Sequence, residues 1–266
     1  MSFSELFFLK LGGSLITDKL AVEVAREETL KRLATEIASA RQQRPEISLV
    51  LGHGSGSFGH SVAARYQTQS GVRDTEQWMG FCKVSAAAAR LNRLVGQALL
   101  DAGVPVVTLQ PSASAVCDDG LLVELSATSV EAALHAGVVP LLYGDVAFDR
   151  VRGGTIISTE QVLGFLAHKL HPEWLLLGGN TSGVYDTNGK VVTHITGANF
   201  AGIREALGGS AGTDVTGGMA SKVRDMLALA EQHQGLSMRI FSGLEPGRLR
   251  DILLDPQQPA GTLITA

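Results

Sequence analysis

Two glycine clusters, each directly after a short apolar run, constrain this chain more than any other feature. The run LFFLK ends at Lys10 and leads into Gly12 to Ser14, and the run ISLVL leads into GHGSGSFGH, Gly52 to His60. Such runs are typical of buried parallel strands, and glycine lets the chain turn sharply and present bare amides where a helix begins. Because such amides bind phosphate, two turns one β-α unit apart predict two phosphate-bearing molecules that face each other. This arrangement favours phosphoryl transfer.

Length and composition exclude several classes of protein. The 266 residues are enough for one large α/β domain, and a net charge of -4 argues against nucleic acid or an anionic membrane surface as the main partner. Cys82 and Cys117 give neither a metal-binding spacing nor a disulfide framework, which fits a reducing cytoplasm. Without a signal peptide or a run of roughly 18 apolar residues, we expect a soluble protein of the cytoplasm.

Apolar runs and helical spacing alternate along the chain. Strand candidates lie at Leu6 to Leu11, Ile47 to Leu51, Val104 to Leu109, Val138 to Tyr143, Trp174 to Leu177 and Met238 to Ser242. Between most of them, apolar residues recur at helical spacing, as at Leu30, Leu33, Ala34 and Ile37. This alternation predicts an α/β fold, a three-layer αβα sandwich around a mostly parallel open sheet.

Turn signals add two details to this fold. Asp118 to Gly120 and Arg152 to Gly154 separate short apolar runs, which predicts β-hairpins appended to the sheet. A helix-like segment stops at His171-Pro172 before the next buried strand. We interpret that point as the boundary between two lobes, about 1–172 and about 173–266, within a single domain of residues 1–266.

Neither glycine cluster matches a nucleotide fingerprint of fixed spacing. GHGSGSFGH lacks the Lys-Ser/Thr ending of a P-loop, and no acidic residue follows at the distance of a Rossmann motif. A different phosphate-binding architecture is therefore expected.

Six motifs in a fixed order supply one. They are KLGGSLITDK (Lys10 to Lys19), GHGSGSFGH (Gly52 to His60), PLLYGDVAFD (Pro140 to Asp149), GTIIS (Gly154 to Ser158), SGVYD (Ser182 to Asp186) and DVTGGMASKV (Asp214 to Val223). Through them nearly the whole chain resembles the amino acid kinase superfamily and, within it, the isopentenyl phosphate kinases. The resemblance implies ATP-dependent phosphorylation of isopentenyl phosphate to isopentenyl diphosphate in isoprenoid biosynthesis, an acceptor lobe followed by a nucleotide lobe, Mg²⁺ that bridges the nucleotide phosphates, and a homodimer.

The resemblance also implies catalytic roles for five residues. Lys10, Lys19 and Lys222 would stabilise the charge of the transferred phosphoryl group, because positive charge and alignment do most of the work in phosphoryl transfer. His60 would hydrogen-bond the phosphate of the acceptor, and Asp145 would order the lysines.

Further binding residues follow from the same motifs. Substrate contacts are expected from Ser55, Gly59, His60 and Gly154. Contacts to ATP are expected from Lys10, Gly12, Gly13, Ser14, Gly56, Asn180, Tyr185, Gly217, Gly218 and Lys222. No side chain is predicted to bind a metal ion directly.

The chain departs from the family pattern at two places. Asn180 and Ser182 stand where relatives commonly carry carboxylates near the nucleotide, so altered purine or metal contacts are possible. Ser158-Thr159-Glu160 replaces an SGD-like triplet, and the role of that aspartate is not transferred to Glu160.

Two questions stay open at the level of sequence. A helix that starts near Glu76 carries Trp78, Met79, Phe81, Val84 and Ala86 to Ala89, which could line a slot for an isoprenoid tail or simply pack in the core. A phosphonate kinase of the fosfomycin-resistance type is an alternative function, although this segment offers few cations beyond Lys83. A nucleotide-sensing regulator that has lost phosphoryl transfer is another alternative.

Overall fold

The predicted strands all form, and they lie in one sheet of eight strands in the order β10-β12-β11-β9-β1-β2-β6-β3. The computed structural model describes residues 3, 5–207 and 218–266, and the side chains of residues 60, 61 and 204–207 lie outside that description. The strands of this main sheet are β1 (Glu5–Leu11), β2 (Ile47–His53), β3 (Val106–Thr108), β6 (Val139–Tyr143), β9 (Trp174–Gly179), β10 (His194–Ile195), β11 (Ser237–Ser242) and β12 (Thr262–Ile264). Neighbouring strands run parallel except β11 with β12, so the sheet is mostly parallel.

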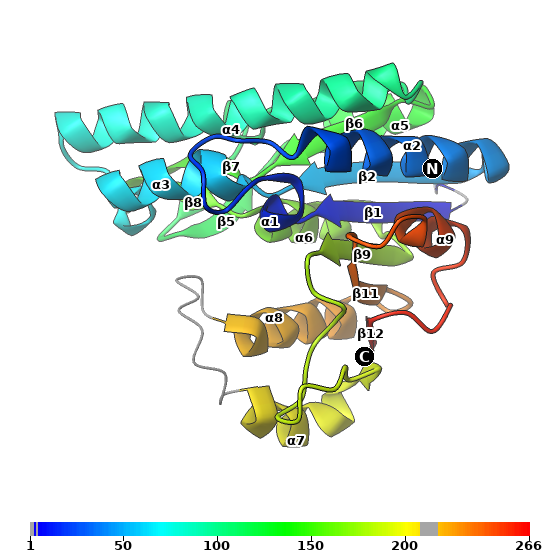
Figure 1. Ribbon diagram of the computed structural model, residues 1–266. Coiled ribbons are helices and arrows are strands. Elements are labelled where there is room, and N and C mark those ends of the chain that lie inside the picture. Colours follow the sequence, from blue (N-terminus) through cyan, green and yellow to red (C-terminus); the bar gives the residue numbers. More distant parts are fainter. Residues whose placement is uncertain (1–2, 4, 208–217) are drawn as a thin grey trace.

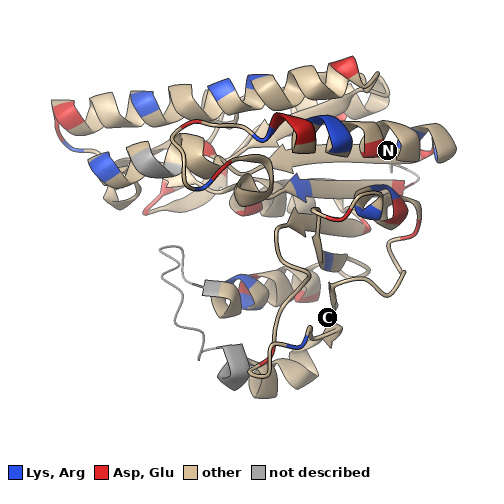
Figure 2. Ribbon diagram, viewed as in Figure 1, with Lys and Arg blue, Asp and Glu red and all other residues tan. Residues whose placement is uncertain are grey.

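Helices cover both faces of this sheet (Figure 1). They are α1 (Gly13–Ile16), α2 (Glu27–Gln43), α3 (Gly56–Tyr66), α4 (Thr75–Asp101), α5 (Thr128–His135), α6 (Thr159–Leu170), α7 (Gly197–Leu207), α8 (Gly218–Gln232) and α9 (Arg248–Leu254), with single 3₁₀ turns at Thr68–Ser70 and Pro111–Ala113. Acidic and basic residues are interspersed along α2 and α4 (Figure 2). Among the described residues, none of the helices has the length and apolarity needed to cross a membrane.

The alternation of side chains along β1 explains the three layers. Phe7 and Leu9 point to one face, where they pack with apolar residues of α2, α4 and α9. Leu6 and Phe8 point to the other face, where they join residues of α5, α6 and α8. Because successive side chains of a strand point to opposite faces, an uninterrupted apolar run requires helices on both sides. The predicted αβα sandwich is confirmed.

The two predicted hairpins form a sheet of their own. Antiparallel pairs join β4 (Val116–Asp118) to β5 (Leu121–Glu124) and β7 (Asp145–Asp149) to β8 (Gly153–Ile157). A parallel contact between β4 and β7 then unites the hairpins into a second sheet in the order β5-β4-β7-β8. The hairpins were expected as separate additions to the main sheet, and their mutual pairing depends on strands too distant in sequence for local turn signals to register.

Helix α6 has well-defined ends, which fixes the position of the residues that it carries. Ser158 caps its first turn by accepting a hydrogen bond from the amide of Gln161, whose side chain accepts one from Ser158 in return. The helix ends at His171, which adopts a left-handed conformation with φ of 52° before Pro172. The next strand, β9, pairs with β1 in the interior of the main sheet, so both predicted lobes share that sheet.

Replacement of Leu51 by alanine tests the packing of the main sheet. Leu51 is 0% exposed on β2, and we expect Leu51→Ala to lower the free energy of unfolding by roughly 2–5 kcal/mol through lost burial and a residual cavity. Leu20→Ala is the matched control, because Leu20 is 98% exposed and its truncation should change stability by less than about 0.5 kcal/mol. Urea unfolding followed by circular dichroism measures both, and equal effects would contradict this packing.

Candidate active site

Glycines gather where the parallel strands of the main sheet end. Strands β11, β9, β1, β2 and β6 lie side by side, so their carboxyl ends meet at one edge. The glycines at this edge are Gly12, Gly54, Gly144, Gly179 and Gly243. Open α/β sheets bind ligands at the carboxyl ends of their strands, which makes this edge the candidate site.

The two glycine turns singled out from the sequence touch each other. A Cβ atom added to Gly54 would lie 2.8 Å from the amide nitrogen of Gly13, and one added to Gly13 would lie 2.6 Å from Cα of Gly56. Gly56 also has a φ of +50°, a conformation that side chains rarely adopt. Only glycine therefore allows the backbones after β1 and β2 to approach so closely.

Hydrogen bonds hold the two turns in register. The hydroxyl of Thr17, which is fully buried, donates to the carbonyl oxygen of Gly13 at 2.7 Å and accepts from the amide of Ser57 at 3.0 Å. The amide of Gly12 donates to the carbonyl of Gly178 at 2.8 Å, which joins the first turn to the end of β9. These hydrogen bonds fix the backbone amides of the two neighbouring turns side by side.

Charged side chains from three elements meet beside these turns. Lys10, 16% exposed at the end of β1, forms an ion pair and hydrogen bond with Glu160 in the first turn of α6. Burial would raise the pKa of the Glu160 carboxyl, but the charge and hydrogen bond of Lys10, together with the charge of Lys222 on α8, hold that pKa below its usual value. Glu160 is therefore an anion that pairs with Lys10 and interacts electrostatically with Lys222, two of the three predicted catalytic lysines.

A hydrogen bond of Thr159, the residue before Glu160, fixes the start of α6. The hydroxyl of Thr159 donates to the carbonyl oxygen of His53 at 2.6 Å, which ties the start of α6 to the end of β2. The sequence did not identify Glu160 as a site residue, although its place in the SGD-like triplet was the available signal.

Asp145 has different partners from those predicted. Its buried carboxylate accepts hydrogen bonds from the amides of Ser112 at 3.2 Å and Val146 at 2.8 Å. Burial raises its pKa, and these hydrogen bonds offset part of that effect. In the described part of the chain its hydrogen bonds go to these amides rather than to a lysine, and they join the start of β7 to the Pro111–Ala113 turn. Its role of ordering the lysines stays a prediction.

The remaining residues predicted around the phosphates differ in where the structure places them. Ser14 lies in α1, and Ser55 and Gly59 lie at the start of α3, next to the touching turns. Lys19 is exposed in the loop that follows α1. His60 belongs to α3 and Gly218 opens α8, but their side-chain environment and all of Gly217 lie outside the described residues.

The residues predicted near the purine follow β9, and the glycine predicted near the acceptor belongs to the second sheet. Asn180 directly follows β9 and is exposed, and Tyr185 is 41% exposed and accepts a hydrogen bond from the amide of Ser182 at 3.4 Å. Gly154 is buried in β8, where an added Cβ atom would lie 2.9 Å from the ring of Phe81.

An aromatic cluster adjoins Gly154. Trp78 and Phe81 on α4 contact each other with ring centroids 5.2 Å apart, and Phe148 on β7 lies 5.4 Å from Phe81. Val84 joins this group, whereas Ala87 packs in the main core. The segment that starts near Glu76 therefore contributes both to the core and to an apolar surface beside the predicted acceptor site.

A buried polar pair beneath the second glycine turn was not predicted from the sequence. The ring of His53, the last residue of β2, receives the amide of Asn92 at Nε2 (3.1 Å) and stacks on Tyr143 at 5.6 Å. Since the carbonyl oxygen of Gly54 can only accept, Nδ1 of His53 carries the proton and donates it to that oxygen at 3.1 Å, and Nε2 accepts from the amide nitrogen of Asn92. Burial lowers the pKa of His53 to about 4, so the ring is neutral at pH 7.

The described residues hold no group of three or more histidine, cysteine, aspartate or glutamate side chains arranged to bind a metal ion. The edge offers amides and lysine ammonium groups, which suit anions instead.

His53 gives the stability of the protein a defined pH dependence. Between about pH 4 and 6.5 the unfolded chain binds a proton at His53 that the folded chain does not bind, so this group destabilises the fold as the pH falls. We expect the stability of wild type relative to His53→Gln to fall by about 2 kcal/mol between pH 7.5 and 5.0. Urea unfolding of both proteins at the two pH values measures this, and a stability difference independent of pH would contradict a buried neutral His53.

Comparison with known proteins places this geometry in a family. Residues 5–242 match the amino acid kinase family. The chain is 36% identical to an isopentenyl phosphate kinase of Methanothermobacter thermautotrophicus over 98% of this chain and 99% of that protein, and 40% identical to one of Haloferax volcanii over 91% and 97%. A solved structure titled as isopentenyl phosphate kinase aligns with a TM-score of 0.83 and 31% identity, covering 98% of this chain and 100% of that one. The chain belongs to the amino acid kinase family.

Proposed function

We propose that this protein is a kinase that transfers the γ-phosphoryl group of ATP to isopentenyl phosphate and so forms isopentenyl diphosphate. The observation that carries the proposal is the direct contact between the glycine turns after β1 and β2, with Lys10 beside them. Two anions held by adjacent sets of backbone amides would have their reacting groups close together. The full-length similarity to proteins named isopentenyl phosphate kinase supports the choice of acceptor.

The nucleotide is proposed to bind the part of the chain at about 173–266 together with the first glycine turn. Amides of Gly13 and Ser14 would bind the terminal phosphates, while Gly12 keeps the turn joined to β9 through its own amide, and Lys222 on α8 would add positive charge. Asn180 and Tyr185, exposed after β9, would border the nucleoside. The amide of Gly218, the first residue of α8, and that of Gly217, which lies outside the described residues, are proposed to bind the phosphates as well.

The acceptor is proposed to bind the part of the chain at about 1–172. Amides of Ser55, Gly56 and Gly59 would bind its phosphate, and His60 would donate a hydrogen bond to the same group. Gly154 is proposed to lie beside that phosphate, and the ring of Phe81 packs directly against it and begins the aromatic cluster. An alkenyl tail has no hydrogen-bonding groups, and this apolar surface suits it.

The proposed reaction depends on charge stabilisation and alignment of the reacting groups more than on proton transfer. An oxygen of the acceptor phosphate attacks the γ-phosphorus in line, while the bond from that phosphorus to the oxygen of ADP breaks. No general base is required, because the acceptor phosphate is already an anion. Lys10, Lys19 and Lys222 would offset the charge of the two anions, and Glu160 would orient Lys10, the role first expected of Asp145.

Further features are proposed from the family. Mg²⁺ would arrive with ATP and keep the phosphates and water as its main ligands, which matches its reluctance to lose water. We also propose a homodimer, located in the cytoplasm and acting in isoprenoid biosynthesis.

A panel of acceptors tests the proposed reaction. With ATP and Mg²⁺, we expect ADP release with isopentenyl phosphate to exceed release with fosfomycin or without acceptor by at least a hundredfold, because the Trp78–Phe81–Phe148 cluster suits an apolar tail. Mass spectrometry of the product identifies the diphosphate. Comparable rates with both acceptors would favour a phosphonate kinase, and no release with any acceptor would favour a regulator that only senses nucleotide.

Glu160→Gln tests the carboxylate that binds Lys10. The amide cannot supply the charge that holds the ammonium in place, so we expect kcat/KM for isopentenyl phosphate to fall by about tenfold to a hundredfold. Glu124→Gln is the control, because it removes an ion pair to Arg150 in which both side chains are more than half exposed. Steady-state kinetics of the two variants decide the matter, and an unchanged kcat/KM in Glu160→Gln would remove Glu160 from the mechanism.

A further inference from the structure

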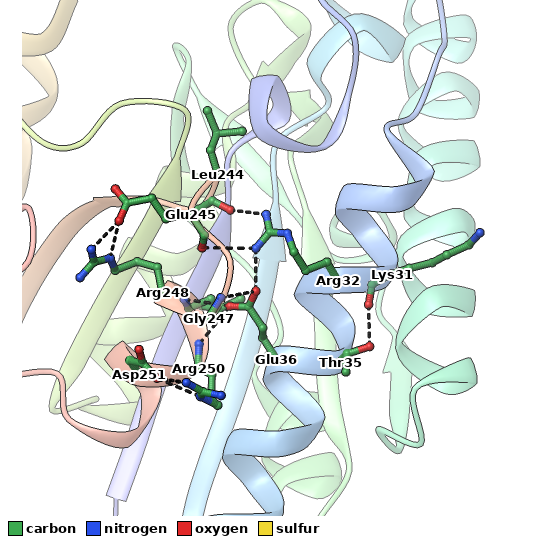
Figure 3. A network of polar contacts seen from close by, with 12 residues as sticks. Lys31, Arg32, Thr35, Glu36, Leu244, Glu245, Gly247, Arg248, Arg250 and Asp251 are labelled. Atoms are coloured by element: carbon green, nitrogen blue, oxygen red, sulfur yellow. Dashed lines mark hydrogen bonds and ion pairs between the residues drawn. The ribbon is translucent and has the colours of Figure 1, made fainter.

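A buried carboxylate on α2 binds the chain just before and within α9 (Figure 3). Glu36 accepts hydrogen bonds from the amides of Gly247 at 3.0 Å, Leu249 at 3.0 Å and Arg250 at 3.3 Å. The same carboxylate forms an ion pair with Arg32, one turn earlier on α2, with 2.6 Å between Nη1 of Arg32 and Oε1 of Glu36. The carboxylate thus satisfies amides at the start of α9 that have no partner within the helix.

Arg32 extends this contact to the other end of the same loop. While one terminal nitrogen pairs with Glu36, the other donates to the carbonyl oxygen of Gly243 at 2.6 Å. The loop 243–247, which leaves the carboxyl end of β11, is therefore held at its first residue by Arg32 and at its last by Glu36 (Figure 3). We call these two side chains the α2 clamp.

The clamped loop lies against both segments proposed to bind the nucleotide. The amide of Gly243 donates to the carbonyl of Gly179 at 2.8 Å, directly before Asn180. A Cβ atom on Gly243 would lie 2.5 Å from Cδ2 of Leu15, which belongs to α1 next to the first glycine turn. Gly243 packs against Leu15 and is hydrogen-bonded to Gly179, so a shift of Gly243 would be transmitted to both residues.

We propose that Arg32 and Glu36 are positioning residues for the nucleotide, acting through the loop 243–247. The inference rests on the proposed function in one respect, that the nucleotide binds between the first glycine turn and the segment after β9. Neither side chain touches the nucleotide itself. In the described part of the chain no hydrogen bond or ion pair joins the clamp to the second glycine turn or to the aromatic cluster, so we expect its effect to fall mainly on nucleotide affinity.

Arg32→Ala and Arg44→Ala form a matched pair of variants. Both arginines belong to α2 or its end, both side chains are 25% exposed, and both donate to a carbonyl near α9. Arg44 binds the carbonyl of Leu254 at 2.7 Å and pairs with Glu5, at the opposite end of α9 from the candidate site. Loss of Arg44 therefore reports the structural effect alone.

Binding of Mg-ADP, measured by titration calorimetry without any acceptor, decides between the two roles. We expect Arg32→Ala to raise the Kd for Mg-ADP and the KM for ATP at least fivefold, with less than a twofold change in the KM for isopentenyl phosphate. Arg44→Ala should leave the Kd for Mg-ADP within twofold of wild type. Equal shifts in the two variants, or no shift in Arg32→Ala, would overturn the proposal.

A second variant covers the case in which Arg32→Ala does not fold. Glu36→Gln keeps the shape of the side chain and one accepting oxygen, and we expect it to raise the Kd for Mg-ADP at least threefold; an unchanged Kd would overturn the proposal. Because the measurement needs no acceptor, a wild-type protein that binds Mg-ADP but does not use isopentenyl phosphate would refute the proposed function and leave this test intact. A wild-type protein that binds no nucleotide would refute both.

Discussion

The contact between two glycine turns at neighbouring strand ends is the constraint on which the rest of the site depends. Gly13 and Gly54 approach so closely that neither could carry a side chain, and the buried hydroxyl of Thr17 joins the two turns. The parallel pairing of β1 with β2 places both turns at one edge. In the proposed mechanism, amides of the two turns would thereby hold two anions within reach of a single transfer.

Charge at this edge is balanced rather than simply positive. Glu160 pairs with Lys10, which holds the ammonium group of this lysine in position, and the charge of Lys222 contributes to lowering the pKa of Glu160. The neutral ring of His53 donates a hydrogen bond to the carbonyl of Gly54 in the second turn and adds no charge there. The carboxylate of Glu36 similarly fixes the loop after β11 from outside the site. Preorganised groups of this kind need little rearrangement when a reaction begins, which is how electrostatic catalysis gains its effect.

Much of this architecture could be predicted from the sequence because its signals are local. Apolar runs predicted the strands, and ordered motifs around Lys10 and Gly56 predicted the family and a pair of glycine turns at strand ends. Pairings between distant segments could not be predicted in the same way. Glu160 meets Lys10 across 150 positions of sequence, and this contact depends on where α6 begins, so the sequence did not identify Glu160 as a partner of Lys10. The burial of His53 likewise depends on how α4 packs over β2.

A crystal structure of the protein with a non-hydrolysable ATP analogue, Mg²⁺ and isopentenyl phosphate tests the central claim most directly. The terminal phosphate of the analogue should contact the amides of Gly13 and Ser14, and the acceptor phosphate should lie at the start of α3. The ammonium group of Lys10 should lie within hydrogen-bonding distance of the terminal phosphate. Nucleotide phosphates bound away from both glycine turns, or two ligands in separate cavities, would contradict the claim.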